Sequence, residues 1–106
     1  MNRASPAVDT PVATTSVQIF DNPAEERYEA QVDGAVAGKA FYELRPGRIV
    51  FLHTEVDPAY EGRGIGSLLA KDALDDVRSK GLRVVARCPF IARYIREHPE
   101  YQDLRA

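Results

Sequence analysis

The hydrophobic pattern of this chain changes its period at one point, and three alternating glycines mark the change. Up to Val56 the apolar side chains follow strand-like patterns, whereas from Ile65 they recur at helical spacing. The connecting segment contains Glu61-Gly62-Arg63-Gly64-Ile65-Gly66. A helix that begins in such a loop offers unpaired N–H groups and the positive end of its dipole. The pattern predicts an anion site, suited to phosphate or pyrophosphate, where a strand passes into a helix.

Two familiar phosphate loops do not fit these residues. A dinucleotide fingerprint needs G-x-G-x-x-G, but its last position would be Ser67 or Leu69, depending on which glycine begins it. A Walker A loop needs Gly-Lys followed by Ser or Thr, and the sequence contains no such triplet. Two interpretations remain open at this point: another kind of phosphate loop, or a glycine-rich turn before an ordinary helix.

The first half of the chain predicts an antiparallel meander. The expected strands are 16–20, 27–32, 36–44 and 48–56. Asp33-Gly34 is a strong hairpin signal, and Pro46-Gly47 indicates the next turn. In 27–32 apolar and polar residues alternate, which is typical of a half-buried strand. In 48–56 apolar residues occupy both faces, which predicts a central strand covered on both sides.

The second half predicts a helix, a strand and another helix. The first helix begins at Ile65 and stops at Gly81, a short strand follows in 82–87, and the second helix runs from Pro89 to His98-Pro99. Pro99–Leu104 predicts one last turn. The fold class is therefore α+β (α/β), a meander followed by β-α-β-α around a mixed sheet, in which strands 48–56 and 82–87 run parallel.

Composition narrows the class of protein. A chain of 106 residues predicts one domain, here 16–106, preceded by a disordered tail over 1–15. The net charge of −2, with both signs interspersed, argues against a nucleic-acid partner. Neither a membrane-length apolar run nor a signal peptide is present, so we expect no membrane association. A single cysteine, Cys88, forbids an internal disulfide and indicates a cytoplasmic location.

Four short motifs follow one another along the chain, and together they carry a family resemblance. They are His53-Thr54-Glu55-Val56, Gly62-Arg63-Gly64-Ile65-Gly66, Cys88-Pro89-Phe90 and His98-Pro99-Glu100-Tyr101. With this order of elements the chain resembles the GNAT superfamily of acetyl-CoA-dependent N-acetyltransferases, and residues 28–104 look like its subgroup of very short single-domain members. The family's pyrophosphate loop has Arg or Gln where this chain has Glu61.

The resemblance implies a minimal GNAT-like fold and a cofactor. Larger members carry two helices between their first two strands, and this chain has no room for them. The acceptor side is therefore expected to be open or completed by a partner. Acetyl-CoA is the implied cofactor, bound chiefly through backbone amides. The implied cofactor-binding residues are Val56, Gly62, Arg63, Gly64, Ile65, Gly66 and Ser67.

The resemblance also implies candidate catalytic residues, each with a plainer alternative. Glu55 occupies the region of the family's general base, and His53 projects from the same strand face. The plainer alternative is that Glu55 forms an ion pair with a nearby arginine and that His53 is an ordinary residue of the sheet. Cys88, at the predicted N-cap of the second helix, is a candidate for an acetyl-enzyme route or a small buried residue. Tyr94 is a candidate general acid or a core residue.

The predicted function is transfer of acetyl from acetyl-CoA to an unidentified amine of a small molecule or protein, by a monomer or weak homodimer. Two alternatives stay open: a module that binds CoA without turnover, and an interaction domain that binds no nucleotide. The choice between direct transfer and a Cys88 intermediate is open as well.

Overall fold

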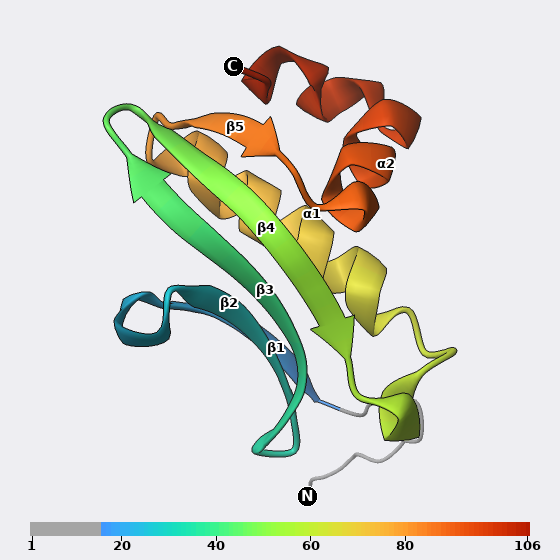
Figure 1. Cartoon of the computed structure of the whole chain (residues 1–106). Helices are drawn as coiled ribbons and strands as arrows, with labels where there is room; N and C mark the ends of the chain where they lie inside the picture. Colours follow the sequence, from blue (N-terminus) through green and yellow to red (C-terminus); the bar gives the residue numbers. More distant parts are fainter. Residues whose placement is uncertain (1–15) are drawn as a thin grey trace, which may run out of the picture.

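The computed structural model describes residues 16–106, so the tail predicted for 1–15 lies outside the described residues. Five strands form one sheet in the order β1-β2-β3-β4-β5, antiparallel except for the parallel pair β4–β5 (Figure 1). The strands are β1 (Val17–Asn22), β2 (Arg27–Val32), β3 (Ala35–Arg45), β4 (Arg48–Val56) and β5 (Arg83–Ala86). The predicted meander, the parallel pair and the α+β class are confirmed.

Two α-helices complete the fold of residues 16–106. Helix α1 (Ile65–Ser79) follows β4, and α2 (Pro89–Glu97) follows β5. Three short 3-10 helices, η3 (Pro23–Glu25), η4 (Pro58–Tyr60) and η5 (Pro99–Leu104), lie in the connections and at the C-terminus. The last is the predicted final turn. No helix in residues 16–106 is long and apolar enough to cross a bilayer.

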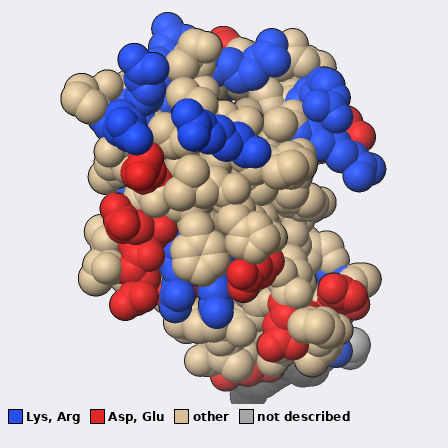
Figure 2. Space-filling view, in the orientation of Figure 1, with Lys and Arg blue, Asp and Glu red and all other residues tan. Residues whose placement is uncertain are grey.

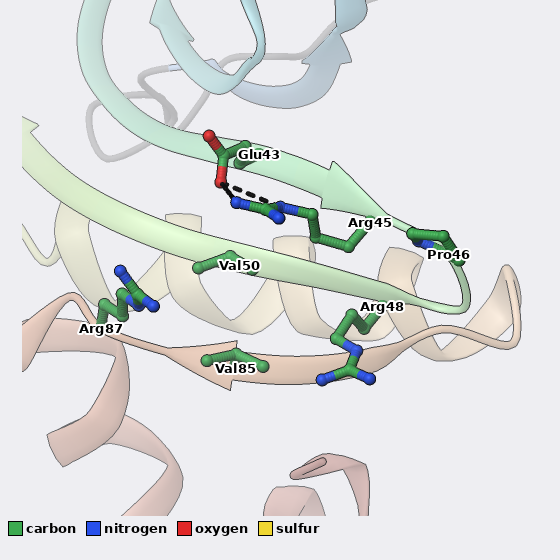
Figure 3. A pocket seen from close by; sticks show the side chains of 7 residues that line it. All are labelled: Glu43, Arg45, Pro46, Arg48, Val50, Val85 and Arg87. Atoms are coloured by element: carbon green, nitrogen blue, oxygen red, sulfur yellow. Dashed lines mark hydrogen bonds and ion pairs between the residues drawn. The ribbon is translucent and has the colours of Figure 1, made fainter.

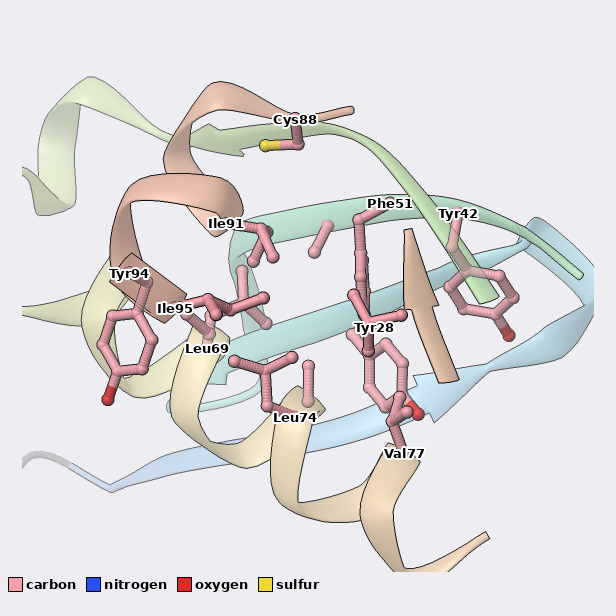
Figure 4. Packing of buried hydrophobic residues seen from close by; sticks show 14 of the residues in the cluster. Tyr28, Tyr42, Phe51, Leu69, Leu74, Val77, Cys88, Ile91, Tyr94 and Ile95 are labelled. Carbon is pink, nitrogen blue, oxygen red and sulfur yellow. The ribbon is translucent and has the colours of Figure 1, made fainter. Parts of the chain in front are cut away.

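Helix α1 covers one face of the sheet. It contacts all five strands, whereas α2 packs against β4, β5 and α1. Its apolar stripe, including Leu69, Leu74 and Val77, is fully buried because residues spaced three and four apart share one helix face. Tyr28 and Phe51 from the sheet lie beside this stripe, as Figure 4 shows. Their ring centres are 6.2 Å apart. The hydrophobic core therefore lies between the sheet and α1.

The opposite face of the sheet, which we call the open face, is turned toward the viewer in Figure 1. No helix described in residues 16–106 lies across it, and Leu52 of β4 is 41% exposed there. The prediction that strand 48–56 is covered on both sides was therefore wrong. Of the apolar residues of β4 on this face, Val50 is 7% exposed, so burial there differs from residue to residue.

A β-bulge at Leu52 changes which side chains reach the open face. Tyr42 pairs with Phe51 and Phe41 with His53, so Leu52 has no partner in β3. Strand side chains alternate strictly, and one extra residue therefore reverses the alternation beyond it. Phe51 faces the core, whereas His53 and Glu55 face outward with Phe41 and Lys39, their partners on β3.

Glu29 of β2 is a charged residue that is buried on the open face. Alternation in β2 predicted it on the polar face, yet it is 3% exposed. Asn22 Nδ2 and Arg27 Nε donate to its Oε2 at 2.9 and 2.8 Å. The bond from Asn22 lowers the pKa of Glu29 below its usual value, with Arg27 adding to the effect, and together they outweigh the opposing effect of burial.

Because the pKa of Glu29 is lower in the folded state, its ionised form stabilises the fold at pH values above the ordinary glutamate pKa of about 4.3. This contribution is lost as pH falls through the lower folded-state pKa. At pH 7 we expect Glu29→Gln to reduce the free energy of unfolding by about 1–3 kcal/mol, and the deficit to shrink in acid. Urea titrations of both proteins at pH 7 and at acidic pH measure it.

Glu43→Gln is the matched control for this prediction. Glu43 lies on the same face and accepts from Arg45, but its side chain is 46% exposed. An exposed pair of this kind contributes less than about 1 kcal/mol. If Glu29→Gln destabilised the protein no more than Glu43→Gln, the buried network around Glu29 would contribute nothing specific.

Candidate active site

The glycine loop between β4 and α1 has the left-handed conformation that its sequence requires. Gly62 and Gly64 have φ of 82° and 75°, and Gly64 is the N-cap of α1. A Cβ added to either glycine would meet nothing within 4 Å, so the space beside the loop is open. No side chain caps the helix, and its first N–H groups are left for an outside acceptor. The loop therefore fits an anion.

The third glycine serves a different purpose. Gly66 lies inside α1, and a Cβ there would come within 3.0 Å of Phe90 Cζ in α2. The absence of a side chain at Gly66 thus allows the start of α2 to pack over the first turn of α1. The sequence analysis did not predict this contact. This contact places the N-termini of the two helices side by side.

Other residues predicted for cofactor binding differ in what they offer. Ile65 is 4% exposed and belongs to the core, so only its backbone is available. Val56 is half-buried against the core, and Ser67 is exposed on the first turn of α1. The guanidinium of Arg63 lies 5.4 Å from the centre of the Tyr60 ring. Arg63 is therefore held beside the loop by a cation–π contact.

Strands β4 and β5 separate next to this loop. Their pairing ends at Phe51 and Ala86, and the carbonyl of Phe51 accepts from the N–H groups of both Arg87 and Cys88, at 3.0 and 2.9 Å. Beyond this point β4 continues to Val56 without a β5 partner, while the chain turns into α2. One edge of β4 over residues 52–56 is therefore free of strand pairing in the described part of the chain.

The predicted pair His53 and Glu55 lies on the open face directly beyond the bulge. His53 Nε2 and Glu55 Oε2 are 3.0 Å apart, and their side chains are 60% and 52% exposed. The imidazole stacks on Phe41, with ring centres 6.3 Å apart. The structure thus brings the two groups together, orients the ring and leaves it accessible to a substrate.

Cys88 has the predicted place at the N-cap of α2 but is 2% exposed. Its sulfur lies 3.2 Å from Thr54 Oγ1, on the core side of β4, and Figure 4 shows it at the top of the core cluster. The thiol and the His53–Glu55 pair therefore lie on opposite faces of β4. This position favours a packing role for Cys88.

Tyr94 lies apart from the other candidates. Its ring stacks on His98 at 3.8 Å and is 6.0 Å from Tyr101, which donates to Asp75 of α1. Burial, followed by nearby Glu100, raises the pKa of Tyr94. The structure joins Tyr94 to the C-terminal turn and not to His53, Glu55 or Cys88.

A hollow of about 430 Å³ lies on the open face over β3, β4 and β5. Val50 and Val85 form its floor, and three arginines, Arg45, Arg48 and Arg87, surround it (Figure 3). Figure 2 shows lysine and arginine side chains gathered over this end of the molecule and acidic ones below it. The sequence analysis missed this group because its members come from three separate strands.

Comparisons with known proteins identify the family to which most of this chain is similar. A family model described as GCN5-related N-acetyl-transferase matches residues 27–104. Protein NATD1 of Xenopus tropicalis is 30% identical over 95% of this chain and 94% of its own length. Protein NATD1 of Gallus gallus and of Mus musculus are each 49% identical over 59% of this chain, and the match spans only 58% of their length.

A solved structure supports the fold alone. The solution structure of a GCN5-like protein from Staphylococcus aureus superposes with a TM-score of 0.65, covering 84% of this chain and 87% of its own, at 22% sequence identity. The predicted minimal fold with a mixed central sheet is confirmed by this likeness.

Proposed function

The chain belongs to the GCN5-related N-acetyl-transferase family, and on that premise we propose that it transfers an acetyl group from acetyl-CoA to an amine. One observation carries the proposal: the uncapped N-terminus of α1 and the exposed His53–Glu55 pair flank the end of the same strand, β4. The first offers a site for a phosphorylated cofactor, and the second offers a proton acceptor.

The residues present fit the cofactor. N–H groups of Ile65, Gly66 and Ser67 at the start of α1 would hold the pyrophosphate, and the open space beside Gly62 and Gly64 admits it. The free edge of β4 over residues 52–56 would pair with an extended chain that carries amides. Acetyl-CoA supplies the acetyl thioester when it is bound.

Proton transfer is assigned to His53. In the tautomer in which His53 Nε2–H donates a hydrogen bond to Glu55 Oε2, Nδ1 carries no proton and can accept one from the amine. Glu55 would hold the ring in this tautomer and stabilise the imidazolium that forms, and the imidazolium could then give its proton to the departing CoA thiolate as the C–S bond breaks. The edge of β4 beyond Phe51, which β5 does not pair with, would present backbone groups to an acyl carbonyl next to His53.

Direct transfer is favoured over an acetyl-Cys88 route. The Cys88 thiol is buried and contacts Thr54 on the core side of β4, whereas the accessible pair faces the other way. A thiol in this place cannot meet an amine on the open face without a movement of α2. Tyr94 has no part in this scheme because it packs with the C-terminal turn.

A thermal-shift titration with acetyl-CoA tests the cofactor and Cys88 together. Ligand at about 100 times its dissociation constant adds about 2.7 kcal/mol of stability, which raises the Tm of a domain this small by roughly 10 °C or more. We expect the same shift in Cys88→Ser and turnover of an amine panel within about tenfold of the parent protein. No shift at millimolar ligand would refute cofactor binding, and acetyl-Cys88 accumulation would refute direct transfer.

The open face, across which no helix described in residues 16–106 lies, also favours a second candidate, a module that binds CoA without turnover. In that case the thermal shift would appear, but acetyl-CoA would not be consumed with any amine. The predictions of no nucleic-acid partner and of a monomer or weak homodimer stay predictions.

A further inference from the structure

The arginine-lined hollow and the His53–Glu55 pair occupy the same face of the sheet. Val50 forms part of the floor, and His53 follows three residues later on β4, on the same face because of the bulge. At about 3.3 Å per residue, the two positions are separated by roughly 10 Å along the strand. A molecule lying along β4 can therefore contact both.

Positively charged side chains outnumber negatively charged ones in the lining of the hollow. Its lining contains three arginines and one glutamate, Glu43, whose Oε1 accepts from Arg45 Nη2 at 2.7 Å. Within residues 16–106 neither Arg48 nor Arg87 forms an ion pair. Guanidinium groups without a carboxylate partner, above an apolar floor, suit an anionic group on a short apolar chain.

Arg87 lines the hollow and also lies at the point where β4 and β5 separate. Its backbone N–H donates to Phe51, the last residue of β4 that pairs with β5. Arg87 directly follows β5, and its side chain lines the hollow together with Val85. The backbone of Arg87 is thus held where the two strands separate, and its positive charge disfavours polycations there.

Resting on the proposed function, we infer that the amine acceptor carries an anionic group, carboxylate or phosphate, which Arg48 and Arg87 bind while the amine reaches His53. Polyamines and other polycationic acceptors are disfavoured by the same arginines. The expected substrate is therefore a small amine that also carries an acidic group.

Four amines of one chain length test this inference: 6-aminohexanoate, 6-aminohexyl phosphate, n-hexylamine and 1,6-diaminohexane. We expect kcat/KM with acetyl-CoA to be about tenfold or more higher for at least one acidic amine than for n-hexylamine, and lowest for the diamine. Whichever acidic amine is preferred identifies the anion as carboxylate or phosphate. Added salt should reduce the preference.

Two variants locate the effect. Arg48→Gln and Arg87→Gln should each raise KM for the preferred acidic amine about five- to tenfold, with kcat and the n-hexylamine rate little changed. Arg93→Gln is the matched control, because Arg93 lies on α2 and pairs with Glu97. Equal kcat/KM for acidic and neutral amines, or equal effects of all three variants, would overturn the inference while leaving the acetyltransferase proposal intact.

A binding measurement separates the two proposals if no amine is acetylated. Methyl resonances of Val50 and Val85, followed by NMR during titration with 6-aminohexanoate, should shift in the parent protein and not in Arg48→Gln. Absence of these shifts in the parent protein would overturn the anion site. Shifts without turnover of any amine would overturn the proposed function and, with it, the role of the hollow in binding an acceptor.

Discussion

His53→Ala is expected to lower kcat/KM for amine acetylation by about 100- to 10,000-fold, the range for removal of a general base. The imidazole is held between Phe41 and Glu55 on the open face, and no other histidine is described near it. Acetyl-CoA binding should stay within about twofold of the parent value, because the N-terminus of α1 does not involve this side chain. Steady-state kinetics and a thermal-shift titration measure the two quantities.

The second histidine of the sequence supplies the control. His98 stacks on Tyr94 and donates from Nδ1 to the Tyr94 carbonyl at 2.7 Å, so His98→Ala should affect stability more than catalysis. Glu55→Gln should lower kcat/KM less than His53→Ala does. The amide of the glutamine still contacts the ring, although it no longer stabilises the imidazolium. The assignment of His53 as base is contradicted by near-normal activity of His53→Ala together with a large loss in Glu55→Gln.

Gly64→Val is expected to weaken acetyl-CoA binding by at least about 100-fold, a loss of roughly 2.7 kcal/mol. Gly64 has a φ of 75°, which valine adopts only at a cost of about 1–2 kcal/mol. Relaxation of this strain turns the first N–H groups of α1 away from a common point, and the valine methyl groups enter the open space beside the loop. Isothermal titration with acetyl-CoA measures the loss.

Gly34→Val separates backbone strain from ligand binding. Gly34 has a φ of 86° in the β2–β3 hairpin, and an added Cβ there also meets nothing within 4 Å. Both variants should lose similar stability in urea unfolding, but only Gly64→Val should lose cofactor affinity. Equal affinities in the two variants would mean that the glycine loop is an ordinary turn, and the cofactor assignment would fail.

Local sequence patterns predicted the elements well where neighbouring residues alone determine them. Strand β2 has the predicted bounds because its side chains alternate without interruption, and α1 starts at Ile65, where the helical spacing begins. The strand predicted over 82–87 is shorter, Arg83–Ala86, because its length depends on pairing with β4, which stops at Phe51. Pairing between distant segments cannot be read from one of them.

Single residues show the same contrast between features that neighbouring residues determine and features that depend on distant segments. The left-handed conformation of Gly62 and Gly64 follows from the glycine pattern, whereas the role of Gly66 depends on Phe90, 24 residues away in α2. The burial of Glu29 depends on Asn22 from β1, which alternation within β2 cannot reveal. Arg48 and Arg87 become neighbours of one hollow only after β4 and β5 pair in parallel.

The sequence by itself determined that His53 and Glu55 project together, because a strand repeats every two residues. It did not determine the face. Without the bulge at Leu52 both side chains would share the face of Phe51, which is fully buried beneath the helices. Only the tertiary structure, through one unpaired residue between β3 and β4, directs them to the open face beside the arginines. The physical reason is that alternation is a local property of the backbone, whereas a bulge arises from the register between two strands.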